Sequence, residues 1–74
     1  MYFETYQSYN ILKAENPRDA VEKTLEEFGI DCSLEQLEDT LFKCIERTED
    51  GVIIRKMHLR ATKIDKDTYV VLLI

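Results

Sequence analysis

The sequence predicts an α+β domain: a three-stranded, mostly antiparallel sheet with two helices on one face, in the order β-α-α-β-β. Two observations favour this class. Segments near both ends of the chain are rich in aromatic and β-branched residues, which are typical of strands, and the middle contains capped amphipathic segments, which are typical of helices. A chain of 74 residues is expected to fold as one domain, residues 1–74, with a thin core.

A first helix is expected over residues 17–28. Asn16 is a preferred N-cap residue, and Pro17 suits the first helical position because a backbone N–H has no intrahelical partner there. Asp19 adds negative charge to the first turn, where it interacts favourably with the helix dipole. Local sequence therefore specifies where this helix begins.

The same helix is expected to end at Gly29, which can adopt the left-handed conformation of a C′ residue. This would place Ile30 beside Leu25, at the two positions that meet in a Schellman motif. Val21, Leu25 and Phe28 fall on one face at helical spacing, so that face is expected to pack in the core.

A second helix is expected over about residues 34–45. Ser33 as N-cap and Gln36 at N3 would form a capping box. Cys32 and Leu37 stand at the two positions of a hydrophobic staple. Apolar residues then recur at helical spacing: Leu34, Leu37, Leu41, Cys44 and Ile45.

The end of this second helix has an alternative reading. The segment "IERTEDGVII", residues 45–54, also fits a hairpin whose turn is Glu49-Asp50-Gly51. Acidic residues here would oppose the dipole at a helix C-terminus. A helix through about Ile45 is preferred, and the alternative gives the order β-α-β-β-β.

Three segments are expected to form strands: residues 2–13, 52–64 and 69–74. The second of them alternates most clearly between apolar and polar residues. One parity is expected to face the core: Ile53, Met57, Leu59 and Ala61. Both helices are expected to pack on these strands, which would bury seven residues: Leu25, Phe28, Leu37, Leu41, Ile53, Leu59 and Val71.

The two cysteines, Cys32 and Cys44, are expected to be free thiols that pack as small hydrophobic residues. There is no C-x-x-C pair and His58 is the single histidine, so cysteine and histidine cannot supply four zinc ligands, and no cofactor or metal is expected. Catalysis by cysteine and histidine would also need an oxyanion hole, for which no Gly-rich turn is present. The chain is therefore not expected to be an enzyme.

Charge is divided unevenly along this acidic chain, which has a net charge of −5. Residues 1–51 contain 13 acidic and 5 basic residues, whereas residues 52–74 contain 2 acidic and 5 basic residues. No apolar segment approaches the roughly 20 residues that span a bilayer, and the N-terminus lacks a signal-peptide pattern, so the chain is expected to be cytoplasmic and not bound to a membrane.

The basic residues of the second half form the candidate binding site. Alternation along the strand would place Lys56, His58 and Arg60 on one face, roughly 7 Å apart from one to the next. Such a row, within a basic stretch over residues 55–63, suits an anionic partner. Tyr2 and Tyr6 would lie near the row if the first strand presented its even-numbered residues there.

These features predict a small non-catalytic protein-interaction or regulatory protein that acts through charge complementarity. One form of this is an acidic inhibitor of a basic or nucleic-acid-binding partner, which would use acidic residues of the helices: Glu22, Glu26, Glu35, Glu38 and Asp39. The alternative is a weak nucleic acid or anion binder that uses the basic strand. Nucleic acid is the less favoured partner because no RNA-binding motif occurs.

A homodimer is also expected, because of the apolar segment "TYVVLLI" at residues 68–74. Two helices cover one face of a three-stranded sheet, which leaves one side of this strand bare. The bare residues would be either Tyr69, Val71 and Leu73, or Val70, Leu72 and Ile74. Pairing of two copies about a two-fold axis would bury them.

Overall fold

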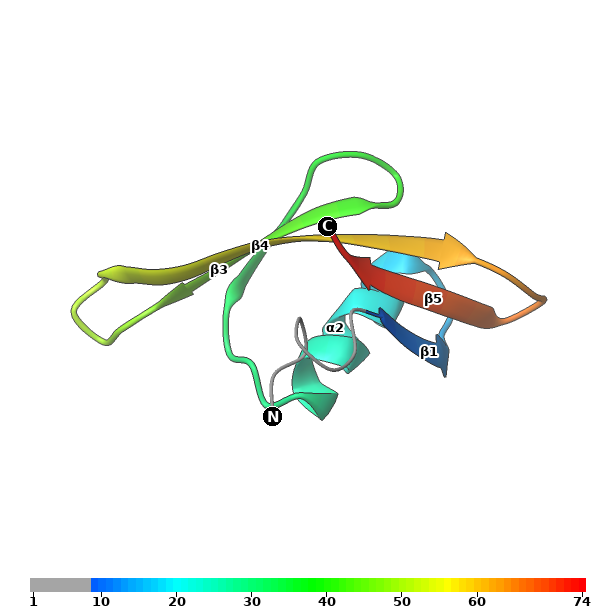
Figure 1. Cartoon of the computed structure of the whole chain (residues 1–74), viewed down its shortest axis with the longest axis horizontal. Helices are drawn as coiled ribbons and strands as arrows, with labels where there is room; N and C mark the ends of the chain where they lie inside the picture. The colour runs from blue at the N-terminus through cyan, green and yellow to red at the C-terminus, as the bar shows by residue number, and fades with distance from the viewer. Residues whose placement is uncertain (1–8) are drawn as a thin grey trace.

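The computed structural model describes residues 9–74 and contains, within them, one helix and a five-stranded antiparallel sheet (Figure 1). The sheet has the strand order β1-β5-β4-β3-β2. The elements in chain order are β1 (Tyr9–Lys13), α2 (Pro17–Glu27), β2 (Ser33–Gln36), β3 (Leu41–Arg47), β4 (Ile53–Lys63) and β5 (Thr68–Leu73).

The predicted three-stranded sheet with two helices is therefore wrong, although the coarse α+β description fits. The described chain has the order β-α-β-β-β-β and is mostly sheet. The alternative order β-α-β-β-β comes nearer, because it converts part of the second helix to a strand, but it still lacks β2.

Helix α2 has the start and the end that its sequence predicts. The Asp19 N–H donates to Oδ1 of the N-cap Asn16 at 2.8 Å. At the other end Gly29 has φ of 71°, and the Ile30 N–H donates to the Leu25 carbonyl at 2.8 Å, as in a Schellman motif. These contacts involve residues within a few positions of one another, which explains why the sequence could predict them.

The predicted second helix is replaced by two strands, β2 and β3, which pair with Leu34 opposite Cys44. Phe42 and Cys44 are fully buried, so the buried residues of β3 repeat every second position. The predicted helical stripe omitted Phe42 and included Leu37, which is 43% exposed. Pairing of β3 with β4, which is distant in sequence, overrides the local helix signals here.

The turn predicted in the alternative reading is confirmed between β3 and β4. The Gly51 N–H donates to the Thr48 carbonyl at 2.9 Å, and the Thr48 N–H donates to the Val52 carbonyl at 2.9 Å. Gly51 has φ of 87°, a conformation that glycine adopts without steric cost.

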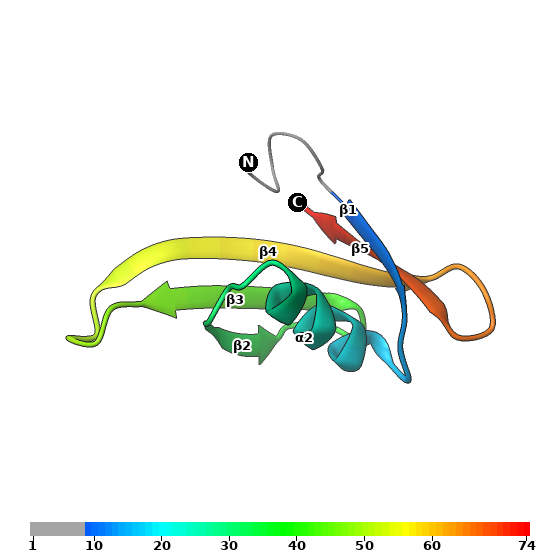
Figure 2. The same ribbon diagram turned by 90° about the horizontal axis from the view of Figure 1, so that it is seen from below.

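Strand β4 extends well beyond the end of its neighbour β5, as Figure 2 shows. Its last residues pair with β5 from Leu59 onward, and the Ile74 N–H donates to the His58 carbonyl at 2.9 Å. Residues 53–57 pair with β3 alone among the described strands. The hairpin of β3 and β4 thus projects from the part of the sheet that α2 covers (Figures 1 and 2).

The core lies between α2 and one face of the sheet. Its buried hydrophobic residues come from the helix, the segment before it and the central strands: Ala14, Ala20, Val21, Leu25, Phe42, Cys44, Met57, Leu59, Ala61, Tyr69 and Val71. The predicted burial of Leu25, Leu59 and Val71 is confirmed. The predicted burial of Leu37 and Ile53 is wrong, because each is 43% exposed. Phe28 and Leu41 are half-buried.

Cys32 and Cys44 are joined by a disulfide bond, so the prediction of two free thiols is wrong. The bond connects the segment before β2 to β3, with a Cα–Cα distance of 6.0 Å. Cys44 is fully buried in the core. Twelve positions separate the two cysteines in the sequence, and the antiparallel pairing of β2 with β3 is what brings them together.

Candidate functional site

The sheet has one face that α2 does not cover, and this face carries the predicted binding residues. In β4, Met57, Leu59 and Ala61 are buried on the helix side, so the alternating residues point to the opposite side. We call this side the open face. Strand register assigns to it Tyr9, Ile11, Val70, Leu72, Leu41, Lys43, Ile45, Lys56, His58 and Arg60.

The structure brings Lys56, His58 and Arg60 together on the open face, as period-2 alternation of the strand requires. Lys56 and His58 are exposed, and within residues 9–74 neither of them forms an ion pair or a side-chain hydrogen bond. Arg60 is half-buried, and its Nη1 donates to Oγ1 of Thr40 at 2.9 Å. This bond fixes the Arg60 guanidinium, while the other two side chains remain available.

Sequence reasoning missed a fourth basic residue of this face, Lys43. It lies directly opposite His58 on the neighbouring strand β3. The predicted helix over about residues 34–45 would not bring Lys43 beside the β4 row, and only the pairing of β3 with β4 does so. Glu35 lies opposite Lys43 on β2 and is the acidic residue that strand pairing places on the same face in the described sheet.

The other half of the open face, on β1 and β5, is mainly apolar, with Lys13 and Thr68 at one end of it. Tyr9 is 47% exposed and Ile11 is 54% exposed, and they pair with Leu72 and Val70, which are half-buried. Ile74, beside His58, is 61% exposed. Of the two sets of β5 residues that the sequence left open, the set with Val70 and Leu72 lies on the uncovered face. Tyr2 and Tyr6 lie outside the described residues.

The predicted acidic residues do not form a single surface. Glu22 and Glu26 are exposed on α2, on the helix side of the sheet, whereas Glu35 points to the open face. Glu38 and Asp39 lie in the turn between β2 and β3. The acidic residues of α2 therefore lie on the side of the sheet opposite to Lys43, Lys56, His58 and Arg60, but the predicted acidic surface is not formed as a unit.

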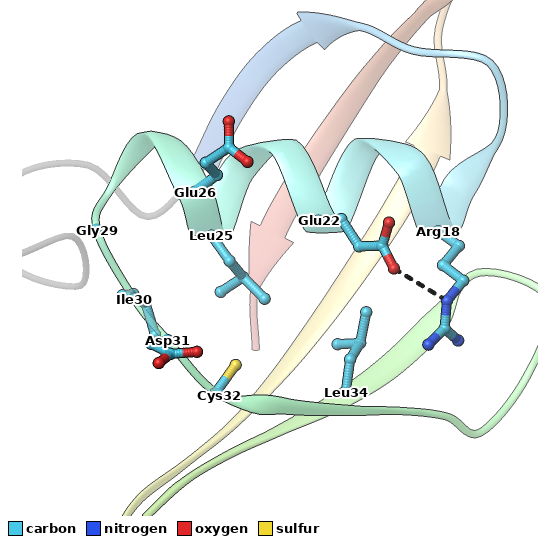
Figure 3. A pocket seen from close by; sticks show the side chains of 9 residues that line it. All are labelled: Arg18, Glu22, Leu25, Glu26, Gly29, Ile30, Asp31, Cys32 and Leu34. Atoms are coloured by element: carbon cyan, nitrogen blue, oxygen red, sulfur yellow. Dashed lines mark hydrogen bonds and ion pairs between the residues drawn. The ribbon is translucent and has the colours of Figure 1, made fainter.

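A pocket of about 530 Å³ lies between α2 and β2 on the helix side of the sheet (Figure 3). Its apolar lining includes Leu25 from the helix and Leu34 from β2, whose side chains point toward one another in Figure 3. Glu22, Glu26 and Asp31 stand around it. Glu22 already interacts with Arg18, whose Nε lies 3.2 Å from its Oε2.

The structure separates the residues that a Cys–His mechanism would need. Cys44 lies on the helix side of the sheet and its sulfur is bonded to Cys32, whereas His58 lies on the open face. Within residues 9–74, histidine, cysteine and acidic side chains do not gather into a group of three that could hold a metal ion.

Comparisons of the chain with protein-family models, with curated proteins and with solved structures found no match. No helix in the described part of the chain is long and apolar enough to cross a membrane.

Proposed function

We propose that this chain is a small non-catalytic protein-interaction protein whose open face binds an acidic surface of another protein. One observation carries this proposal: a protein with a net charge of −5 places Lys43, Lys56, His58 and Arg60 side by side on the sheet face that its helix leaves uncovered. Exposed charges of one sign steer an oppositely charged partner and select against partners of the same sign.

Apolar residues beside this basic group can supply the area that such an interface buries. Leu41 and Leu72 flank Arg60 on its two neighbouring strands, and Ile45 lies opposite Lys56. The Arg60 guanidinium is already held by Thr40, so less side-chain entropy is lost when it contacts a carboxylate.

The experiment compares two double variants with equal charge change. Lys43→Glu with Lys56→Glu reverses charge on the open face, whereas Lys63→Glu with Lys66→Glu reverses it at and beyond the end of β4. Arg60 is left unchanged, because its replacement would also remove the bond to Thr40. In affinity capture from the native host followed by binding measurements on the captured partner, the first variant is expected to bind about tenfold more weakly or worse.

The control variant and the wild type are expected to bind that partner alike, and added salt should weaken both. Melting temperatures of all three proteins should agree, so that lost binding reflects lost charge. Equal affinity of the two double variants would overturn the proposal.

Binding of single-stranded nucleic acid is the second candidate, favoured by the exposed ring of Tyr9 on the same face as the basic residues. Aromatic side chains next to cationic ones provide stacking and phosphate contacts. Titration with an oligothymidylate and with poly-glutamate separates the candidates. Tighter binding of oligothymidylate than of poly-glutamate would favour nucleic acid over an acidic protein, provided that Tyr9→Ala removes the difference.

The interface that we propose for the predicted homodimer is the apolar half of the open face. Self-association through Tyr9, Ile11, Val70 and Leu72 would cover these side chains and would keep the basic residues of β3 and β4 at the rim. Pairing through the basic half would instead oppose like charges, which disfavours it.

The cytoplasmic location predicted from the sequence remains a proposal, and the Cys32–Cys44 bond argues against it. Disulfide bonds persist mainly in oxidising compartments. Alkylation of freshly lysed native cells before reduction, followed by mass spectrometry, decides between them: two alkylated cysteines would support the cytoplasm, and two protected ones an oxidising compartment.

A further inference from the structure

The pocket between α2 and β2 lies beside a strand edge that has no partner among the described residues. β2 pairs with β3 on one side and is the last strand of the sheet. The Leu37 N–H donates to the Leu41 carbonyl at 2.8 Å, which continues the β2–β3 ladder. Because bonded and non-bonded pairs alternate in an antiparallel ladder, the backbone N–H and C=O groups of Leu34 and Gln36 point away from β3.

These outward groups can bond an added strand. The side chains of that strand would alternate like those of β2, with one row toward α2 and the other toward the open face. Residues in the first row would meet Leu34 and Leu25, in the pocket that Glu22 and Asp31 also line. Residues in the second row would lie beside Glu35, whose side chain is exposed.

We propose that the free edge of β2 binds an extended segment of a partner protein in which apolar and basic residues alternate. Main-chain hydrogen bonds to Leu34 and Gln36 would supply affinity, and the pocket of about 530 Å³ would take apolar side chains. Charge complementarity selects basic residues for the remaining positions, because these positions point to the open face beside the exposed carboxylate of Glu35.

This site goes beyond the proposed function. The open face binds an acidic surface through the basic residues of β3 and β4, whereas the free edge of β2 binds a basic segment through its main chain, the pocket and Glu35. The two sites use different residues, so either can fail without the other. Together they would make this chain a connector between partners of opposite charge.

The probe is an acetylated and amidated peptide with the repeat Val-Lys, and its counterpart has the repeat Val-Glu. Binding is measured by NMR titration of the wild type and of two variants at one position. Gln36→Pro removes the outward N–H without touching the β3 ladder, and Gln36→Ala keeps that N–H. Both variants lose the side-chain bond from Gln36 to the Asp39 carbonyl at 3.3 Å, so they form a matched pair.

The wild type and Gln36→Ala are expected to bind the Val-Lys peptide with similar affinity, and Gln36→Pro about tenfold more weakly. Saturation with the peptide should also slow hydrogen exchange at the Leu34 N–H of the wild type, which electrostatic attraction alone would not do. This second readout decides the matter if Gln36→Pro does not fold.

Unchanged exchange at Leu34, or equal binding by the two Gln36 variants, would overturn the site. Equal binding of the Val-Glu peptide would overturn the choice of a basic segment. The wild-type chain could also assemble with itself as its concentration rises. If Gln36→Pro abolished that assembly, the choice of a foreign partner would be overturned, and residues 52–57 of a second copy would be the occupant.

Discussion

The side-chain amide of Asn10 donates from Nδ2 to Oγ1 of Thr24 at 3.1 Å, and this buried bond joins the edge strand β1 to helix α2. The Thr24 hydroxyl in turn donates to the Ala20 carbonyl at 2.8 Å. Both polar side chains are at least 94% buried, since Asn10 is 6% exposed and Thr24 is 1% exposed. These two polar groups can be buried because the Thr24 hydroxyl accepts a hydrogen bond from the Asn10 amide.

Thr24→Val keeps the shape of the side chain and removes the acceptor for Asn10. The buried amide would keep only its longer contact with Oε2 of Glu27 at 3.4 Å, so we expect a loss of about 1–3 kcal/mol in the free energy of unfolding. Asn10→Leu should then cost less in the Thr24→Val background than in the wild type. Urea unfolding of all four proteins measures this coupling, and strictly additive losses would contradict it.

Truncation to alanine should destabilise the fold more at residues under α2 than at residues on the open face. Leu25→Ala and Leu59→Ala should each cost about 2–5 kcal/mol, because both side chains are buried. Leu41→Ala should cost less, because Leu41 is half-buried on the face without a helix. Chemical denaturation checks the order, and a Leu41 variant as unstable as the Leu59 variant would show that something covers the open face.

Loss of the disulfide should destabilise the fold, since the bond restricts the unfolded chain over a separation of 12 residues. Cys32→Ala with Cys44→Ala should lower the free energy of unfolding by about 2–4 kcal/mol. Reducing agent should lower the melting temperature of the wild type and leave that of the double variant unchanged. An unchanged melting temperature of the wild type in reducing agent would contradict the presence of the disulfide bond.

Asp19 should contribute to the pH dependence of stability. The Glu15 N–H donates to its Oδ2 at 3.0 Å and holds the pKa of the Asp19 carboxyl below the ordinary value of 3.8; Lys23 adds to this effect. A lowered pKa in the folded state stabilises the fold above 3.8, and this stabilisation is lost as the pH falls through the folded-state pKa.

The free energy of unfolding of Asp19→Asn should therefore fall less on acidification than that of the wild type. Unfolding free energies of the variant and the wild type should differ at neutral pH and converge as the pH falls below the Asp19 pKa. NMR titration of the carboxyl gives that pKa directly. A constant gap between the two curves across the acid range would contradict the assignment.

The homodimer can be tested with a matched pair of isoleucines. Ile11 on the open face and Ile64 in the turn after β4 are both 54% exposed. Ile11→Glu should shift the protein to monomer in sedimentation equilibrium at micromolar concentration, because it places a charge in the apolar contact. Ile64→Glu should keep the wild-type mass. A wild type that stays monomeric as its concentration rises would end the dimer proposal.

The candidate site was half predictable from the sequence. Alternation in β4 is a local pattern, so it places Lys56, His58 and Arg60 on one face without knowledge of the neighbouring strands. Lys43 joins them only through the pairing of β3 with β4. The contact of Arg60 with Thr40 depends on the same pairing.

The local features that the sequence alone determines depend on interactions between residues within about five positions of one another. The Asn16 cap, the Gly29 termination of α2 and the Gly51 turn all form between near neighbours, so their signals are complete in a short window. Alternation in β4 belongs to the same class, since it needs only one strand and the presence of a core.

Tertiary structure decided the rest, because residues 33–47 carry signals for both helix and strand. Ser33 and Gln36 would suit a capping box, yet Phe42 packs opposite Leu59 in β4, and this pairing yields two strands instead of a helix. The pairing of β2 with β3 then brings Cys32 to Cys44 and leaves the other edge of β2 without a partner among the described strands. Contacts between segments distant in sequence set the energy of these choices, and no short stretch of the chain contains both partners.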